Sequence, residues 1–214
     1  MKILFIASGS NPKTLGGIQT FGRMLKKFFP EDLEFVCYSK NEKYYFKVND
    51  VNEININLIF RVINKILNNK LKNYCLKKYI SKLKPEICIL NDPKELYSLN
   101  DDIKKILVQH RNYNAYISSY CKNNLKLIED LKNKIDFFIF LSEFDQKKFI
   151  KELRFPIEKT MVIRHCSEIP LLKKQKQKNK NLVMISRIIN NPKRFDLAIN
   201  SMSKLPDFIL NIYG

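Results

Sequence analysis

Residues 182–196, with the sequence LVMISRIINNPKRFD, carry the pattern that decides the fold. An apolar run of strand type ends at Ser186 and Arg187, a short polar loop follows, and Lys193 precedes apolar residues at helical spacing. Together with the apolar run at 208–213, this predicts a strand at 182–186, a helix at 194–204 and a second strand. Two cations at the carboxyl end of a buried strand, beside the start of a helix, suit a diphosphate.

The rest of the chain repeats this alternation of short apolar runs and longer helical patterns. Strands are expected at 3–7, 33–38, 87–90, 106–109, 137–141 and 161–163, and helices at 17–29 and, as one or two basic amphipathic helices, at 54–83. A further helix is expected after Ser142, which forms a capping-box pattern with Asp145. Strands that alternate with helices predict an α/β fold, a parallel sheet covered by helices.

A change of composition separates the two parts of the chain. Residues 167–181 include KKQKQKNKN at 173–181, which cannot bury an apolar face and is typical of a solvated linker. We therefore expect a domain at 1–166, a basic linker at 167–181 and a β-α-β unit at 182–214.

The amino-acid composition indicates which kinds of partner, metal site and cellular location to expect. Lys and Arg total 39 against 21 Asp and Glu, a formal charge of +18, which favours polyanions such as anionic lipid, nucleic acid or phosphorylated ligands. A genome rich in Lys and Asn codons is the alternative cause of this charge.

Five cysteines without a Cys-x-x-Cys pair argue against a zinc or redox site and suit reduced thiols. The first apolar run is too short for a secretion signal, and no run approaches the ~20 residues of a membrane span, so a cytoplasmic location is expected.

Two further places suggest ligand contact. Gly16 and Gly17 stand just before the first helix, where paired glycines let a ligand approach the backbone and the free N–H groups attract phosphate. The loop matches neither a Walker A motif nor Gly-x-Gly-x-x-Gly, and a plain turn is the alternative. His110 ends a predicted strand, where ligands bind in open α/β sheets, although a single histidine is often structural.

At residues 16–17, 110 and 182–198 the sequence resembles GT-B glycosyltransferases of the glycosyl transferases group 1 type. This resemblance implies a Rossmann-like acceptor domain at 1–166 and the β-α-β start of a second Rossmann-like, nucleotide-sugar-binding domain. It implies that Arg187 and Lys193 hold the donor diphosphate, that His110 is the catalytic residue facing the donor sugar, and that Gly16 and Gly17 form the glycine loop at the cleft. His165 falls at the interdomain crossover, as a hinge residue.

The implied reaction is the transfer of a hexosyl group from a nucleotide-sugar to a glycan or lipid-linked acceptor, in cell-envelope polysaccharide or glycolipid synthesis. Negative charge grows on the diphosphate as the glycosidic bond breaks, so two fixed cations stabilise the transition state without a metal or cofactor. The carboxylate pair that follows in the resembling enzymes is absent, so the sequence resembles a truncated, frameshifted or split enzyme, and we expect poor turnover by this chain alone.

Other functions remain open from sequence. The basic segment at 54–83 fits either a sheet-covering helix with a solvated face or a helix on the anionic inner face of the cell membrane. A non-catalytic membrane- or polyanion-binding module is therefore the alternative function. No nucleic-acid-binding motif is recognisable, so no nucleic-acid partner is expected. The oligomeric state does not follow from the sequence.

Overall fold

The computed structural model describes residues 1–7, 9–39, 43–55, 58–67, 70–121, 124–164, 180–186 and 193–213. The chain forms two compact units, Met1–Cys166 and Ser167–Gly214.

The first unit is built on a sheet of seven strands, all of them parallel, in the order β3-β2-β1-β4-β5-β6-β7. The strands are β1 (Ile3–Ile6), β2 (Leu33–Ser39), β3 (Val51–Asn55), β4 (Ile87–Leu90), β5 (Lys104–Val108), β6 (Phe137–Phe140) and β7 (Thr160–Val162). The chain first runs outward from β1 to β3, then returns to place β4 against the other side of β1. The strand order therefore reverses between β1 and β4, and ligands bind beyond the carboxyl ends of the strands at such a switch point.

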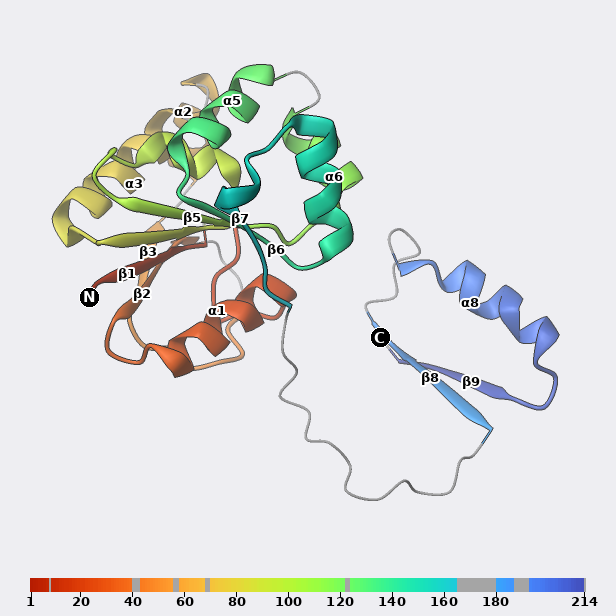
Figure 1. Ribbon diagram of the computed structural model, residues 1–214. Helices are drawn as coiled ribbons and strands as arrows, with labels where there is room; N and C mark the ends of the chain where they lie inside the picture. Colours follow the sequence, from red (N-terminus) through yellow and green to blue (C-terminus); the bar gives the residue numbers. More distant parts are fainter. Residues whose placement is uncertain are drawn as a thin grey trace. The chain divides into compact units, whose positions relative to one another are not determined.

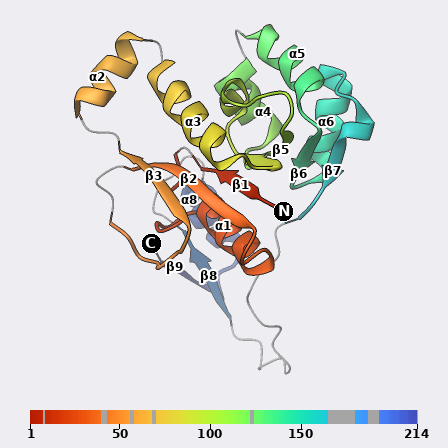
Figure 2. The ribbon, with the colours of Figure 1, turned by 90° about the vertical axis from the view of Figure 1, so that its left-hand side faces the viewer.

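Helices cover both faces of this sheet. Those of the first unit are α1 (Gly17–Phe28), α2 (Leu58–Ile66), α3 (Lys70–Leu83), η1 (Pro93–Ser98), α4 (Tyr113–Tyr116), η2 (Ile117–Cys121), α5 (Leu125–Lys134), α6 (Glu143–Leu153) and η3 (Ile157–Lys159). Figures 1 and 2 show α1 on one face and α3, α5 and α6 on the other. Strand β1 is buried on both sides, because Leu4 and Ile6 enter the core under α3 to α6 while Ile3 and Phe5 enter the core under α1.

A glycine brings α1 close to the sheet. Gly22 is buried in the middle of the helix, and a Cβ atom there would lie 3.0 Å from the Phe35 ring and 3.3 Å from the Phe5 ring. The close contact explains a residue that is otherwise unfavourable inside a helix. It also fixes where the N-terminus of α1 lies relative to the end of β1.

The sequence did not predict β3, and the helix expected from residue 54 begins later. Ile54 pairs with Tyr38 of β2 as part of an edge strand, and the helical segment is two helices, α2 and α3. The strand reads Val-Asn-Glu-Ile-Asn, and its polar residues are poor strand formers. Asn52 stabilises it from its side chain, which donates to Glu34 at 3.2 Å.

The helix expected after Ser142 is α6, and its cap differs from the predicted box. The Ser142 hydroxyl accepts the Asp145 N–H at 3.1 Å, as predicted. The Asp145 carboxylate accepts the Ser142 hydroxyl at 2.7 Å and the backbone N–H of Tyr113 at 2.8 Å. The cap therefore also fastens the start of α4.

The second unit is a β-α-β unit, as predicted. It comprises β8 (Asn181–Ile185), α8 (Phe195–Ser201), η4 (Met202–Lys204) and β9 (Ile209–Tyr213), and the two strands pair in parallel. Asn181, the last residue of the predicted linker, is the first residue of β8. Residues 165–179, which include His165 and most of that linker, lie outside the described residues.

Candidate functional site

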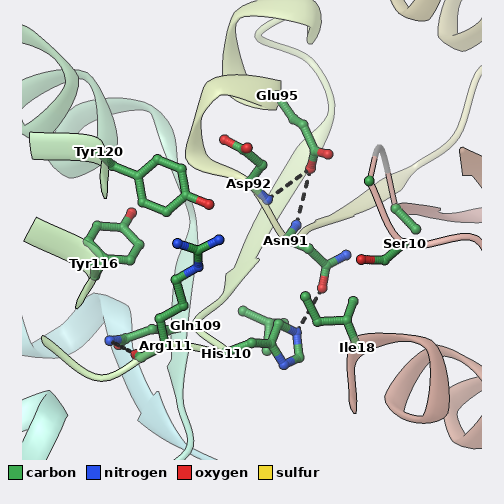
Figure 3. A pocket seen from close by; sticks show the side chains of 13 residues that line it. Ser10, Ile18, Asn91, Asp92, Glu95, Gln109, His110, Arg111, Tyr116 and Tyr120 are labelled. Carbon is green, nitrogen blue, oxygen red and sulfur yellow. Dashed lines mark hydrogen bonds between the residues drawn. The ribbon is translucent and has the colours of Figure 1, made fainter. Parts of the chain in front are cut away.

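A cavity of about 200 Å³ lies at the switch point of the sheet, beyond the carboxyl ends of β1, β4 and β5. Its walls come from the loop after β1, the turn after β4, the end of β5 and the short helices α4 and η2. Figure 3 shows the polar side chains that line it. The volume suits a small polar group or a single sugar ring rather than a large apolar ligand.

His110, predicted as a site residue, lines this cavity. Its Nε2 atom is 2.8 Å from the Asn91 side-chain oxygen, and the Asn91 amide nitrogen donates to the carbonyl of Ile6 at 2.7 Å. Because that nitrogen is engaged by a carbonyl, the Asn91 oxygen faces the ring and Nε2 must carry the proton. The Phe21 ring packs edge-on against the imidazole at 5.3 Å between centroids. The ring is thus held in one orientation, with Nε2 and its proton toward Asn91.

The turn after β4 is held by a buried carboxylate. Glu95 is 5% exposed, and one of its oxygens accepts the backbone N–H groups of Asn91 at 3.1 Å and Asp92 at 3.2 Å. The Asp92 side chain in turn caps η1 through the Lys94 N–H at 2.9 Å. Asn91 is therefore fixed through its backbone as well as its amide. The sequence analysis did not predict this role for Asn91 and Asp92.

The far side of the cavity is polar and partly aromatic. The Gln109 amide donates to the Arg111 carbonyl, and the Arg111 guanidinium donates to Ser119 at 2.9 Å and lies 5.4 Å from the centre of the Tyr120 ring. Burial raises the pKa of Tyr116 well above its usual 10, so this phenol stays protonated. Sequence reasoning missed these residues, although the rule that located His110 at the end of a strand applies equally to its neighbours.

The two predicted glycines begin α1 next to the cavity, which Ile18 of that helix lines. Gly16 has φ +150°, a backbone conformation that residues with a side chain rarely adopt, so this position favours glycine. A Cβ atom at Gly17 would meet open space. Arg23 fixes the preceding loop by donating to the carbonyl oxygens of residues 12 and 14 at 2.7 and 2.9 Å. The helix has no acidic residue in its first turn and no side-chain cap, so its positive end is open to an anion.

The predicted diphosphate residues belong to the second unit. Lys193 is exposed and stands two residues before α8. Arg194 pairs with Asp196 at 2.7 Å, so the cation beside Lys193 is engaged within its own unit. Arg187 lies outside the described residues. The pairing of Arg187 with Lys193 stays a prediction.

Within the described part of the chain, no three His, Cys, Asp or Glu side chains are grouped closely enough to hold an ion.

Comparisons with known proteins found similarity only at the level of structure. No family model matches, and no curated protein matches in sequence. The lipopolysaccharide outer core galactosyltransferase WaaB superposes with a TM-score of 0.66 at 13% identity, over 100% of this chain and 68% of that one. HepE of Anabaena, solved with UDP-glucose, gives a TM-score of 0.69 at 14% identity, over 99% of this chain and 60% of that one.

A third neighbour, sucrose-phosphate synthase from Thermosynechococcus elongatus, gives a TM-score of 0.69 at 11% identity over 99% of this chain. The chain spans between 60% and 68% of the length of these three structures. At such identities the likeness concerns the fold. Together with the seven-stranded parallel sheet, it shows that this chain has the Rossmann-like GT-B fold of glycosyltransferases.

Proposed function

We propose that the protein takes part in transferring a sugar from a nucleotide-sugar to a glycan or lipid-linked acceptor. The observation that carries this is the polar cavity at the switch point, with an oriented His110 on one side and the open N-terminus of α1 on the other. The fold is found in enzymes of this class, and the HepE structure holds UDP-glucose. Hexosyl transfer in the cell envelope is the form of the reaction that we favour.

The residues have separable roles in this proposal. Within the first unit, the first-turn N–H groups of α1, reached past Gly17, attract an anionic group of the ligand. The Lys193 ammonium group, in the second unit, attracts the donor diphosphate. Negative charge that grows on this leaving group is stabilised by groups already in place. His110, held by the hydrogen bond between its Nε2 and the Asn91 oxygen, lines the cavity, where its imidazole contacts the donor sugar. Arg187 is the second cation of the pair by resemblance.

The test is to measure the binding of UDP and of UDP-glucose to the chain by titration calorimetry. We expect wild type to bind both, and Lys193→Ala to weaken binding about 10- to 100-fold, because a charge-assisted hydrogen bond contributes about 1.5–3 kcal/mol. Lys204→Ala removes an exposed lysine from the same unit and is the matched control, expected to bind as wild type does. In an active form, Lys193→Ala should lower turnover by about 10²-fold.

Two results would argue against this function. If wild type bound neither UDP nor UDP-glucose, a nucleotide-sugar could not be its donor substrate. That result would favour the alternative of a non-catalytic binding module. Equal losses in Lys193→Ala and Lys204→Ala would show only a general attraction of anions to a basic chain.

A membrane surface is the second partner that we propose. No helix in the described ranges is long and apolar enough to cross a bilayer. Helix α2, however, exposes the apolar side chains of Val62, Ile63 and Ile66, and Lys65 on the same helix is exposed. Exposed apolar residues combined with cations favour the interface of an anionic membrane.

Flotation with vesicles tests this partner. We expect binding to anionic vesicles that weakens as salt rises, little binding to neutral ones, and a loss in Ile66→Ser. Leu125→Ser replaces an equally exposed residue at the start of α5 and should bind normally, since Ile66 is 72% and Leu125 78% exposed. Equal binding to neutral and anionic vesicles would contradict the proposal.

A further inference from the structure

Among the described residues, two buried polar atoms on the cavity wall have no hydrogen-bond partner. Tyr116 and Gln109 are each 3% exposed, and within the described structure neither the Tyr116 hydroxyl nor the Gln109 side-chain oxygen has a partner. Both residues line the cavity (Figure 3). The one other such atom among the described residues, the Ser98 hydroxyl, belongs to a residue that does not line it.

Packing does not account for the Tyr116 hydroxyl. The ring already packs on Phe149 at 5.1 Å and Phe138 at 5.9 Å between centroids, and a phenylalanine would keep those contacts. A buried donor without a partner costs about 1–3 kcal/mol. The hydroxyl therefore destabilises the free protein, and such a group calls for a ligand or a bound water.

The available atoms define what the ligand must offer. The Gln109 amide nitrogen is engaged by the Arg111 carbonyl, which leaves the oxygen as a pure acceptor. A tyrosine hydroxyl both donates and accepts. A phosphate has no proton to give to Gln109, and it would meet Asp92 and Glu95, which line the same cavity. A hydroxyl group can donate to the Gln109 oxygen and can donate to or accept from the Tyr116 hydroxyl, and a sugar ring carries several hydroxyl groups.

We propose that Tyr116 and Gln109 form a subsite that binds the hydroxyl groups of a neutral sugar ring. This assignment rests on the proposed function, because it takes the sugar ring to be part of the nucleotide-sugar donor or of the glycan acceptor. Arg111 and Tyr120 border the subsite, and the Arg111 guanidinium lies over the Tyr120 ring. The two side chains therefore form one wall of the subsite, and we do not expect the guanidinium to pair with a charged group of the ligand.

The experiment compares Tyr116→Phe with Ser98→Ala, because both remove a buried hydroxyl without a partner and only the first lies at the cavity. The probes are UDP, UDP-glucose, and the methyl glycosides of glucose, galactose, mannose and N-acetylglucosamine. Nucleotides are titrated by calorimetry, and glycosides are followed by saturation-transfer NMR. Tyr116→Phe should weaken binding of the sugar-bearing probe about threefold to tenfold, the value of one hydrogen bond, and leave UDP unchanged.

The source of the ring follows from which probe responds. Weaker binding of UDP-glucose, with UDP unaffected, assigns the subsite to the donor sugar. Weaker binding of a methyl glycoside alone assigns it to the acceptor. Ser98→Ala should match wild type throughout, and both variants should unfold in urea at a midpoint equal to or above that of wild type.

Three results would overturn the inference. One is unchanged binding of every probe by folded Tyr116→Phe, which would leave a structural water as the partner. Another is equal weakening by Ser98→Ala. The third is the absence of binding of any glycoside or UDP-glucose by wild type. If wild type binds a glycoside but no nucleotide, the proposed transferase function fails while the subsite stands.

Discussion

Replacing Asn91 by alanine should release His110 from its single orientation. The change removes two hydrogen bonds, from the amide to the Ile6 carbonyl at 2.7 Å and between the amide oxygen and His110 Nε2 at 2.8 Å. At about 0.5–1.5 kcal/mol for each bond, the loss of stability should be about 1–3 kcal/mol. For a domain of this size, each kcal/mol lowers Tm by about 2–4 °C.

The orientation of the ring has its own readout. One hydrogen bond of about 1 kcal/mol biases the tautomer ratio about fivefold toward the form with the proton on Nε2. Nitrogen-15 NMR of the neutral imidazole distinguishes the two tautomers directly. The sequence contains two histidines, so His165→Gln leaves only the signal of His110. We expect the Nε2–H form to dominate in this background, and Asn91→Ala to reduce its excess about fivefold.

Asn52→Ala is the matched control. Its amide also makes two bonds, to Glu34 at 3.2 Å and to the Phe35 carbonyl at 3.4 Å, but on the edge strand β3. It should lose stability without changing the tautomer ratio. A wild-type ring protonated mainly on Nδ1, or a ratio unaffected by Asn91→Ala, would refute the placement of the Asn91 amide and with it the role given to His110.

Two other predictions follow from the glycine loop and from buried acids. Gly16→Ala should lower the free energy of unfolding in urea by about 1–3 kcal/mol, because the φ of Gly16 is +150°. Gly17→Ala should leave the free energy of unfolding unchanged or slightly higher, yet it should weaken UDP binding. Equal losses of stability in the two variants would contradict this. Burial raises the pKa of Cys88 to about 12 from its usual 9.0 and that of Cys121 to about 11. Because these folded-state values are raised, the stability contributed by the protonated thiols is complete below about pH 9 and is lost as pH rises through 11 to 12. The urea midpoint should therefore fall between pH 9 and 11 as the thiols of the unfolded chain ionise; a constant midpoint would contradict it.

Periodicity predicted the elements whose apolar residues face a core. Strands β1 and β6 and helix α1 were found because their apolar residues recur at strand or helix spacing. Strand β3 was missed because an edge strand of polar residues is held by pairing with β2, a long-range contact with no local pattern.

The candidate site was predicted only in part, for a similar reason. His110 and Gly16 were found from their places at a strand end and before a helix. Asn91, the partner that orients His110, is 19 residues away in the sequence and is brought to it only by the fold. Tyr116 lines the cavity from the short helix α4. Its sequence pattern does not distinguish a cavity residue from an ordinary core residue. Arg187 lies outside the described residues, so its pairing with Lys193 is a matter for experiment.

The bond from Asn91 to the Ile6 carbonyl joins residues 85 positions apart, and this separation bears on how the protein folds. During synthesis, β1, α1, β2 and β3 all emerge before β4, so β1 at first has one strand edge without its eventual partner. Loop closure over such a distance is slow compared with helix formation. The cavity therefore arises late, only when β4 and β5 have both docked beside the first strand. Until then the unpaired edge of β1, a strand made entirely of apolar residues, is open to pairing with another molecule.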